Sequence, residues 1–481
     1  MVTEQIDVPA GVASAEGLDG GQAATVRALM EAWQGHVASN RRNEDYYEGR
    51  YPVESLGIAI DPDNAGMFQE RVDWARKAVD YIACRSQFDG FSAAEDDGGT
   101  VDWLRRWVAD NDVHNAYAGA VTSALTHSCC FATVTVPDGA ADPVLRFYPA
   151  TAASALWDRR LGRIGAGMVV VDMEDRPGGG AAEPSLVEAY TDTETIVLRR
   201  TGGGWSAESE PHTLGRCPMV ALCNRPSLRH PFGRSKIGPG LRSIIGEASE
   251  VMNLMKLAVQ FAAAPQTYAL GLDPDAMGET SPLRKYMDRL WAVSKDEDGD
   301  VPTFGQLPQQ SMEPLLSTMR TLSSMAAADA NVPAETFGVV TDNPSSAEAI
   351  NASREDAVIE VNRLNRLAGA ALRDAALTAL AMRDDVPFDE AAAAHPTVAA
   401  KFRPASTPSE ASVSDAMLKQ SQIIEWLADS DVLLKRLGYT DEEIADLEET
   451  RRGYRSSKLA EVIASGMQPG PGGVTTGDAE P

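Results

Sequence analysis

The chain has few cysteines and no segment that would anchor it in a membrane. Its five cysteines include no Cys-x-x-Cys pair, and an odd set of this kind indicates reduced thiols in a cytosol rather than a disulfide framework. No uncharged apolar run reaches the roughly 18 residues of a membrane span. The first residues, MVTEQIDV, lack the basic and apolar regions of a secretory signal. We expect no membrane partner, and we interpret the cysteines as small buried side chains: Cys84, Cys129, Cys130, Cys217 and Cys223.

Recognisable catalytic motifs are also missing. The sequence contains neither the Gly-x4-Gly-Lys-Ser/Thr phosphate loop nor the His-Glu-x-x-His metal motif. The glycines at 162–167 stand in the wrong order for a dinucleotide site, and Ile237 replaces the last glycine of a nucleophile elbow after Ser235. The six histidines have no neighbours at metal-ligand spacing. We predict no catalytic, cofactor-binding or metal-binding residues, and therefore a protein that is not an enzyme.

Basic residues are scarce. Lys and Arg number 43 against 70 Asp and Glu, which gives a formal net charge of −27. Because proteins that grip DNA neutralise its phosphates with a basic face, tight sequence-independent DNA binding is excluded, although such a chain could enclose DNA without holding it. One locally basic stretch carries candidate contacts for DNA or for a neighbouring subunit, with a solvated surface as the alternative: Arg225, Arg234, Lys236 and Arg242.

Hydrophobic periodicity predicts a mainly helical α+β protein. Leu29, Trp33 and Val37, for example, recur at a helical spacing of four residues. Short β-rich runs separated by turn clusters occupy about 131–222 and predict an antiparallel sheet flanked by helices. The expected helices cover 25–48, 66–87, 100–128, 235–264, 311–331 and 346–383. The last one would be about 57 Å long, which indicates a helix that crosses between subdomains or subunits.

A loop of unusual length, 332–345, separates the last two of these helices. Pro333 and Pro344 prevent helix at both ends, and Gly338 provides a hinge. Loops of this length between helices tend to be functional or disordered. We therefore predict a mobile loop, with an ordinary surface connection as the alternative. Since it has no Lys or Arg, a duplex would meet it by shape rather than by ion pairing.

Several short motifs, taken in their order, resemble the portal proteins of tailed phages, in the siphophage branch typified by SPP1. The resemblance covers about 25–465. The resemblance rests on the order in which these motifs occur together, rather than on any one of them. The motifs are Trp33, Arg41-Arg42-Asn43 and Tyr46-Tyr47 with Gly49; Arg85 with Asp89-Gly90-Phe91; Trp107 with Asn111; Pro218 with Asn224-Arg225-Pro226; Gly233-Arg234-Ser235 before an apolar helix; and Asn343-Pro344-Ser345-Ser346-Ala347-Glu348.

This resemblance implies a portal fold in a ring of about twelve subunits at one capsid vertex, with DNA packaged and ejected through its axial channel. The implied parts are a wing (25–234), two stem helices (235–264 and 311–331) around a clip (265–310), a tunnel loop (332–345), a long helix and return strand to the wing (346–410) and a crown (411–465). Composition alone predicts the two ends as flexible tails, because residues 1–24 are small, acidic and Gly-rich and residues 466–481 are Pro/Gly-rich. The tunnel-loop residues facing the DNA channel would be Phe337, Val339, Thr341, Asp342 and Asn343.

The resemblance also implies partners. The clip would face the terminase large subunit and later a head-completion or adaptor protein, through an acidic loop with Asp296, Glu297, Asp298 and Asp300. The major capsid and scaffolding proteins would be further partners, in a virion assembled in the cytoplasm of the host bacterium. Two alternatives remain open: another capsid-associated structural protein, such as a minor head protein, and an enzyme with an unrecognised active site.

Overall fold

The computed structural model describes residues 10–53, 69–93, 99–137, 139–174, 182–202, 204–263, 267–270, 303–306, 311–338, 347–406 and, with short gaps, 410–451. The chain forms two compact units, Met1–Ala405 and Ser406–Pro481. The first contains helices and antiparallel sheets, and the described part of the second is helical. The α+β character expected from the sequence is therefore confirmed.

Helix α1 (Gly20–Tyr47) packs on a five-stranded antiparallel sheet. Its buried stripe includes Leu29, Trp33 and Val37, which share one hydrophobic cluster with residues of the sheet. The Trp33 indole N–H donates to the Thr151 carbonyl oxygen at 3.0 Å, so the largest buried side chain of the helix also has its polar atom satisfied. The strands, in spatial order, are β4 (Ala153–Asp158), β5 (Arg163–Glu174), β6 (Glu183–Tyr190), β7 (Glu194–Thr201) and β8 (Gly204–Pro211).

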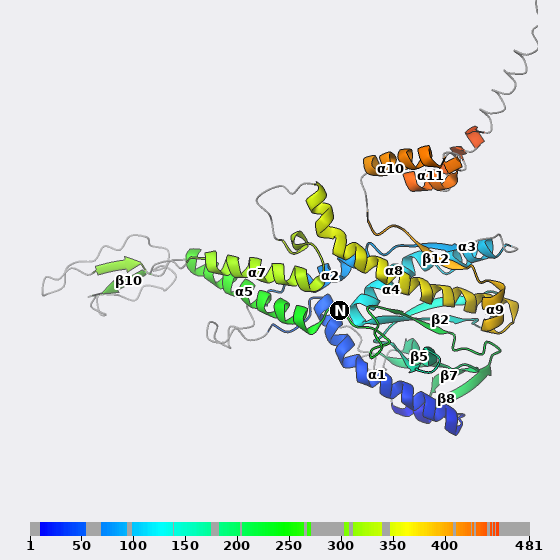
Figure 1. The fold of residues 1–481 in the computed structure, drawn as a ribbon. Helices are drawn as coiled ribbons and strands as arrows, with labels where there is room; N and C mark the ends of the chain where they lie inside the picture. Colours follow the sequence, from blue (N-terminus) through cyan, green and yellow to red (C-terminus); the bar gives the residue numbers. More distant parts are fainter. Residues whose placement is uncertain are drawn as a thin grey trace, which may run out of the picture. The chain divides into compact units, whose positions relative to one another are not determined.

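Two further sheets and a long helix complete the body of the first unit (Figure 1). The three-stranded sheet has the order β3 (Val144–Pro149), β2 (Cys129–Thr135) and β9 (Met219–Cys223), and the two-stranded sheet pairs β1 (Phe88–Ser92) with β12 (Ala399–Phe402). The main core joins these sheets to α2 (Trp74–Ala83), α4 (Val113–His127) and the 38-residue α8 (Ala347–Asp384). After α8, α9 (Phe388–Ala394) leads into β12.

Helices α5 (Pro239–Ala263) and α7 (Glu313–Ala330) lie side by side (Figure 1), and we call this pair the two-helix arm. Between them in sequence, β10 (Thr267–Leu270) pairs antiparallel with β11 (Thr303–Gln306). The 3-10 turn η4 (Ala334–Phe337) follows α7. The second unit contains α10 (Glu410–Ile423) and α11 (Asp431–Leu437).

The structure differs from the sequence prediction near the N-terminus. Part of the predicted flexible tail, residues 10–24, is folded, and the 3-10 helix η1 (Ala10–Ser14) buries Val12 completely. The backbone N–H of Glu16 donates to the Trp205 carbonyl oxygen at 2.8 Å, which ties this segment to β8. Asp19 then caps α1, so the helix begins earlier than its apolar stripe. The prediction of a flexible tail is wrong for these residues because distant side chains of β8 cover them.

A second difference lies in the helix predicted over 100–128. It is two helices, α3 (Thr100–Asp110) and α4, separated at Asp112. Asp112 has φ 48°, in the left-handed region that aspartate tolerates better than most residues. The chain therefore turns between two amphipathic segments that share a helical pattern in sequence.

Candidate functional site

A buried ion pair joins the two-helix arm to the long helix of the body. Lys236, just before α5, places its Nζ 2.7 Å from both carboxylate oxygens of Glu360 on α8. Their side chains are only 1% and 8% exposed. Arg225, two residues after β9, donates to Glu360 Oε2 at 2.9 Å, and the Asn331 amide, at the C-cap of α7, lies 3.5 Å from the same oxygen. One carboxylate thus contacts groups at the start of α5, the end of α7 and the end of β9.

Burial and charge act on Lys236 in opposite directions. Removal from water lowers the pKa of Lys236, and the Glu360 carboxylate partly offsets this effect by favouring the charged amine. Because a buried ammonium without a counter-charge is costly, Glu360 is the group that allows Lys236 to lie here.

The four basic residues predicted to contact DNA or a neighbouring subunit differ in their burial and in their partners. Lys236 is buried against Glu360, so its prediction as a DNA or intersubunit contact is wrong. Arg242, on α5, donates to Asn43 Oδ1 at 2.6 Å and to the Ile237 carbonyl oxygen at 2.9 Å. The Arg225 side chain keeps 38% of its surface, and Arg234 is exposed. Among the four, Arg225 and Arg234 are thus the ones with substantial surface for a partner.

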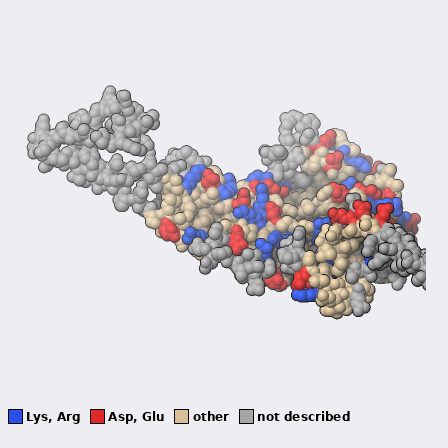
Figure 2. Space-filling model, turned by 90° about the horizontal axis from the view of Figure 1, so that it is seen from above, with Lys and Arg blue, Asp and Glu red and all other residues tan. Residues whose placement is uncertain are grey.

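The face of the molecule in Figure 2 carries Lys and Arg intermixed with Asp and Glu over the described residues. No broad basic area stands out on that face. Such a distribution suits proteins that do not hold nucleic acid through phosphate neutralisation.

Phe337, predicted to face a DNA channel, lies in the core instead. Its side chain is 5% exposed and meets the Trp74 ring edge-on, with ring centroids 5.6 Å apart. Turn η4 ends at Gly338, whose φ of 87° is readily accessible to glycine. The first part of the predicted loop is therefore a packed turn, because an aromatic side chain after Pro333 finds an apolar partner on α2. The other tunnel-loop candidates, Val339, Thr341, Asp342 and Asn343, lie outside the described residues, as do the acidic clip residues Asp296, Glu297, Asp298 and Asp300.

The two-helix arm combines a polar anchor to the body with apolar side chains left in solvent. The Tyr51 hydroxyl and the Ser249 hydroxyl lie 2.8 Å apart in a buried hydrogen bond, and Asn253 Nδ2 donates to the Glu70 carbonyl oxygen at 3.0 Å. The same helix α5 exposes Met252 and Val259, seven residues apart and hence on one face. On α7, Leu316 and Met325 are also exposed. Several large apolar side chains on one slender element are typical of a surface that another chain covers.

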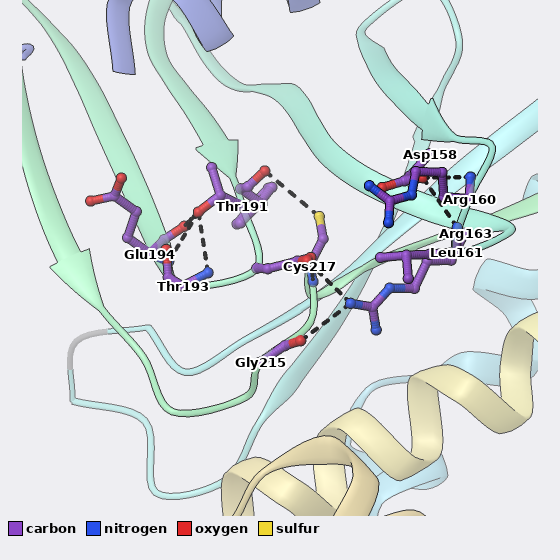
Figure 3. A network of polar contacts seen from close by, with 11 residues as sticks. Asp158, Arg160, Leu161, Arg163, Thr191, Thr193, Glu194, Gly215 and Cys217 are labelled. Carbon is purple, nitrogen blue, oxygen red and sulfur yellow. Dashed lines mark hydrogen bonds and ion pairs between the residues drawn. The ribbon is translucent and has the colours of Figure 1, made fainter. Parts of the chain in front are cut away.

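A set of turns holds the rim of the five-stranded sheet in place (Figure 3). Asp158 accepts from the backbone N–H groups of Arg160 and Leu161, which fixes the hairpin between β4 and β5 and lowers the Asp158 pKa. Arg163 Nη2 donates to the Gly215 carbonyl oxygen at 3.3 Å and pairs with Asp192 at 3.1 Å. This rim borders a groove of about 760 Å3 whose opposite wall is α8, with Leu367, Ala371 and Asp374.

The described cysteines and histidines form no reactive centre. Burial raises the pKa of Cys130 and Cys217 to about 12, so these thiols stay protonated near neutral pH. His127 is buried beside Ser123, and its pKa is lowered to about 4 by burial. Among the residues that the structure describes, no cluster of three or more His, Cys, Asp or Glu side chains could hold a metal ion. None of the described helices is long and apolar enough to cross a membrane.

Sequence reasoning missed Glu360. It lies between Ala357 and Val361 on the buried stripe of α8. A carboxylate among apolar positions of a helix is the available signal, since burying it requires a cation. Its partners were not evident, because Lys236 lies 124 positions earlier in the chain.

Comparison with known proteins points to the portal proteins of phages. The family described as "Phage portal protein, SPP1 Gp6-like" matches residues 29–455. The portal protein of Mycobacterium phage D29 is 29% identical over 440 residues, which make up 88% of this chain and 87% of that protein. The portal protein of Mycobacterium phage L5 is 28% identical over 406 residues, with 81% and 80% of the two chains covered. A chain in the virion of a native gene transfer agent particle is 13% identical, with 83% of this chain and 99% of that chain covered, at a TM-score of 0.43.

Proposed function

The chain belongs to the SPP1 Gp6-like family of phage portal proteins, and we propose that about twelve copies form a ring at one capsid vertex through which double-stranded DNA is packaged and ejected. The portal role expected from the sequence motifs is confirmed by the family match and by the two mycobacteriophage relatives. What we propose beyond this role is the ring, its DNA channel and its partners.

The observation that carries the ring is the solvent-exposed apolar surface of the two-helix arm. Val259 on α5 and Met325 on α7 each leave 51% of their surface in solvent in the single chain. Burial of apolar surface stabilises association by roughly 25 cal/mol per Å2 before the entropic costs are subtracted. In a ring, each arm would serve as a stem and cover the exposed face of the next.

The charge of the chain suits a channel that DNA slides through. A lumen with many Lys and Arg contacts to phosphate would bind the duplex tightly and in a salt-dependent way. With a net charge of −27 per chain, a ring would instead repel the duplex toward its axis at short range, since screening sets in beyond about 8 Å in physiological salt. Because the sequence has no phosphate loop, the energy for packaging would come from a partner ATPase, the terminase large subunit.

Individual segments receive roles within this proposal. Val339, Thr341, Asp342 and Asn343 would form the part of the tunnel loop that meets DNA. The acidic clip residues Asp296, Glu297, Asp298 and Asp300 would steer the terminase and later the head-completion protein. Arg225 and Arg234 would contact the neighbouring subunit. Residues 411–465 would form the crown, and the assembled ring would lie in the virion, next to the major capsid and scaffolding proteins, after assembly in the host cytoplasm.

A disulfide between neighbouring subunits tests the tunnel-loop assignment. The variants are Thr341→Cys and Asn343→Cys, made with Cys84→Ser because Cys84 is an exposed native thiol. We expect oxidation to leave the ring assembled and to stop DNA packaging, with reduction restoring it. The matched control is Ala118→Cys, at an exposed position on α4, and oxidation should leave its packaging unchanged. Packaging at the wild-type rate by a fully cross-linked Thr341→Cys ring would show that the loop does not restrict the channel.

A further inference from the structure

Strand β12 has an open edge beside a groove lined by arginine. Among the described residues, β12 pairs only with β1. The Arg403 N–H donates to the Gln87 carbonyl oxygen at 2.9 Å on the β1 side. Because the backbone groups of successive residues in a strand point in opposite directions, the N–H and C=O of Phe402 and Ala400 face the other edge. An edge of this kind can accept another strand.

The groove at this edge has a volume of about 600 Å3 and lies between β12 and α8. Gly369 lets the strand approach the helix closely, since a Cβ at this position would lie 3.2 Å from the Phe402 ring. The lining residues Gly369, Ala370 and Ala400 have little side-chain volume, which leaves room in the groove for a peptide backbone. The lining includes Arg366, Gly369, Ala370, Arg373, Ala400 and Phe402.

The charge of the groove is opposite to that of the chain. Its lining includes two arginines and no carboxylate, in a protein of net charge −27. Arg373 Nε donates to the Val398 carbonyl oxygen at 3.0 Å, and its Nη1 lies 4.0 Å from Asp374 Oδ1, so this arginine is fixed at one end of the strand and partly neutralised. Arg366 is exposed, and no hydrogen bond or ion pair connects its side chain to the other described residues. One guanidinium is thus positioned by the fold, and a second one is accessible to a ligand.

We propose that this groove binds an extended acidic segment of a partner protein, which pairs with the open edge of β12 and places carboxylates near Arg366 and Arg373. A peptide strand satisfies backbone N–H and C=O groups, whereas the phosphates of DNA offer no donors to the strand's carbonyl groups. Arginine binds carboxylates through two parallel hydrogen bonds, so it would select acidic side chains on the added strand. The site does not depend on ring formation, so its failure would leave the proposed channel function untouched.

The first test uses the full chain and a labelled nine-residue peptide of alternating Glu and Val or Thr, followed by fluorescence anisotropy. A second peptide carries the same side chains but has N-methyl groups on alternate residues, which remove the N–H donors that pair with β12. We expect the N-methylated peptide to bind at least about tenfold more weakly, the loss of roughly one or two hydrogen bonds. Equal binding of the two peptides, or no binding of the first, would overturn the proposal.

The second test separates Arg366 from the general charge of α8. Arg366→Glu should weaken binding of the unmodified peptide at least about tenfold, because it replaces a charge-assisted hydrogen bond by repulsion. Arg363→Glu changes the net charge equally at an exposed position of the same helix but lies outside the groove lining, and we expect less than a twofold effect. Equal weakening by both variants would contradict a defined site.

Two further results would identify a different occupant of the groove. Displacement of the peptide by a short DNA duplex would assign the groove to nucleic acid, and peptide binding only to dissociated chains would assign it to a second copy of this chain. Either result overturns the proposal.

Discussion

Lys236 and Glu360 form a buried ion pair in which the Lys236 ammonium lies 2.7 Å from both oxygens of the Glu360 carboxylate. The pair connects the segment before α5 to the middle of α8. Since the arm and the long helix are separate elements of the chain, this contact is a principal polar link between them, and its loss should affect both stability and the position of the arm.

Glu360→Gln should destabilise the chain by about 3 kcal/mol, because it leaves the Lys236 ammonium buried without its counter-charge. The double variant Lys236→Met with Glu360→Leu should recover most of this loss, since it removes both charges. Urea unfolding of the three proteins measures the effect. The matched control is Asp102→Asn, which breaks an exposed pair with Arg105 and should cost less than about 1 kcal/mol. If Glu360→Gln costs no more than this control, the pair does not hold the junction.

Phe337→Ala should lower the free energy of unfolding by about 3–5 kcal/mol, because it empties a site beside Trp74 in the core. Thermal and denaturant unfolding measure it. A residue that only faced a channel would leave stability unchanged when truncated and would alter packaging alone. If Phe337→Ala leaves the free energy of unfolding unchanged but impairs packaging, Phe337 faces the channel as the sequence predicted.

Acidification should weaken the fold through His127. Burial lowers the pKa of this histidine from 6.5 to about 4 in the folded chain, so the unfolded chain takes up a proton first as the pH falls. The contribution of the neutral side chain is fully present above about pH 6.5 and is lost progressively toward pH 4, by about 3 kcal/mol in total.

The measurement compares wild type with His127→Gln by urea unfolding at pH 7, 6, 5 and 4.5. Other groups also titrate in this range, so the difference between the two proteins isolates His127. We expect the stability of wild type to fall more steeply than that of the variant as the pH is lowered. Parallel curves would mean that His127 has the same proton affinity in both states.

The exposed apolar residues of the arm should control assembly rather than folding. Val259→Glu and Met325→Glu place a charge on a surface that a neighbouring chain would bury, and each should shift most of the protein from ring to free chain at micromolar concentration. Circular dichroism should be unchanged. Leu228→Glu is the control, since Leu228 is fully exposed on a loop of the body outside the arm. Mass photometry distinguishes the species, and rings formed equally by all three variants would contradict assembly through the arm.

Helix periodicity predicted much of this fold. The long helix expected at 346–383 is Ala347–Asp384, and the helices expected at 235–264 and 311–331 lie within those limits. These segments were predictable because their apolar stripes are long, and local signals such as proline and glycine mark their ends.

Contacts between distant segments were not predictable in this way. The end of the helix before Phe337 was predictable from the nearby proline and glycine. The packing of the Phe337 side chain against Trp74, 263 positions earlier, leaves no signal in the local sequence. The same holds for the covering of Val12 by β8 and for the pairing of Lys236 with Glu360. In each case the environment of a side chain is decided by tertiary structure, which a single sequence does not display.

Negative-stain electron microscopy of the purified full chain, combined with its mass in solution, tests the central claim most directly. We predict closed rings with a central hole, and a particle mass about twelve times that of the 51.4 kDa chain. A stable single chain at micromolar concentration, or assemblies without a central hole, would contradict the proposed channel.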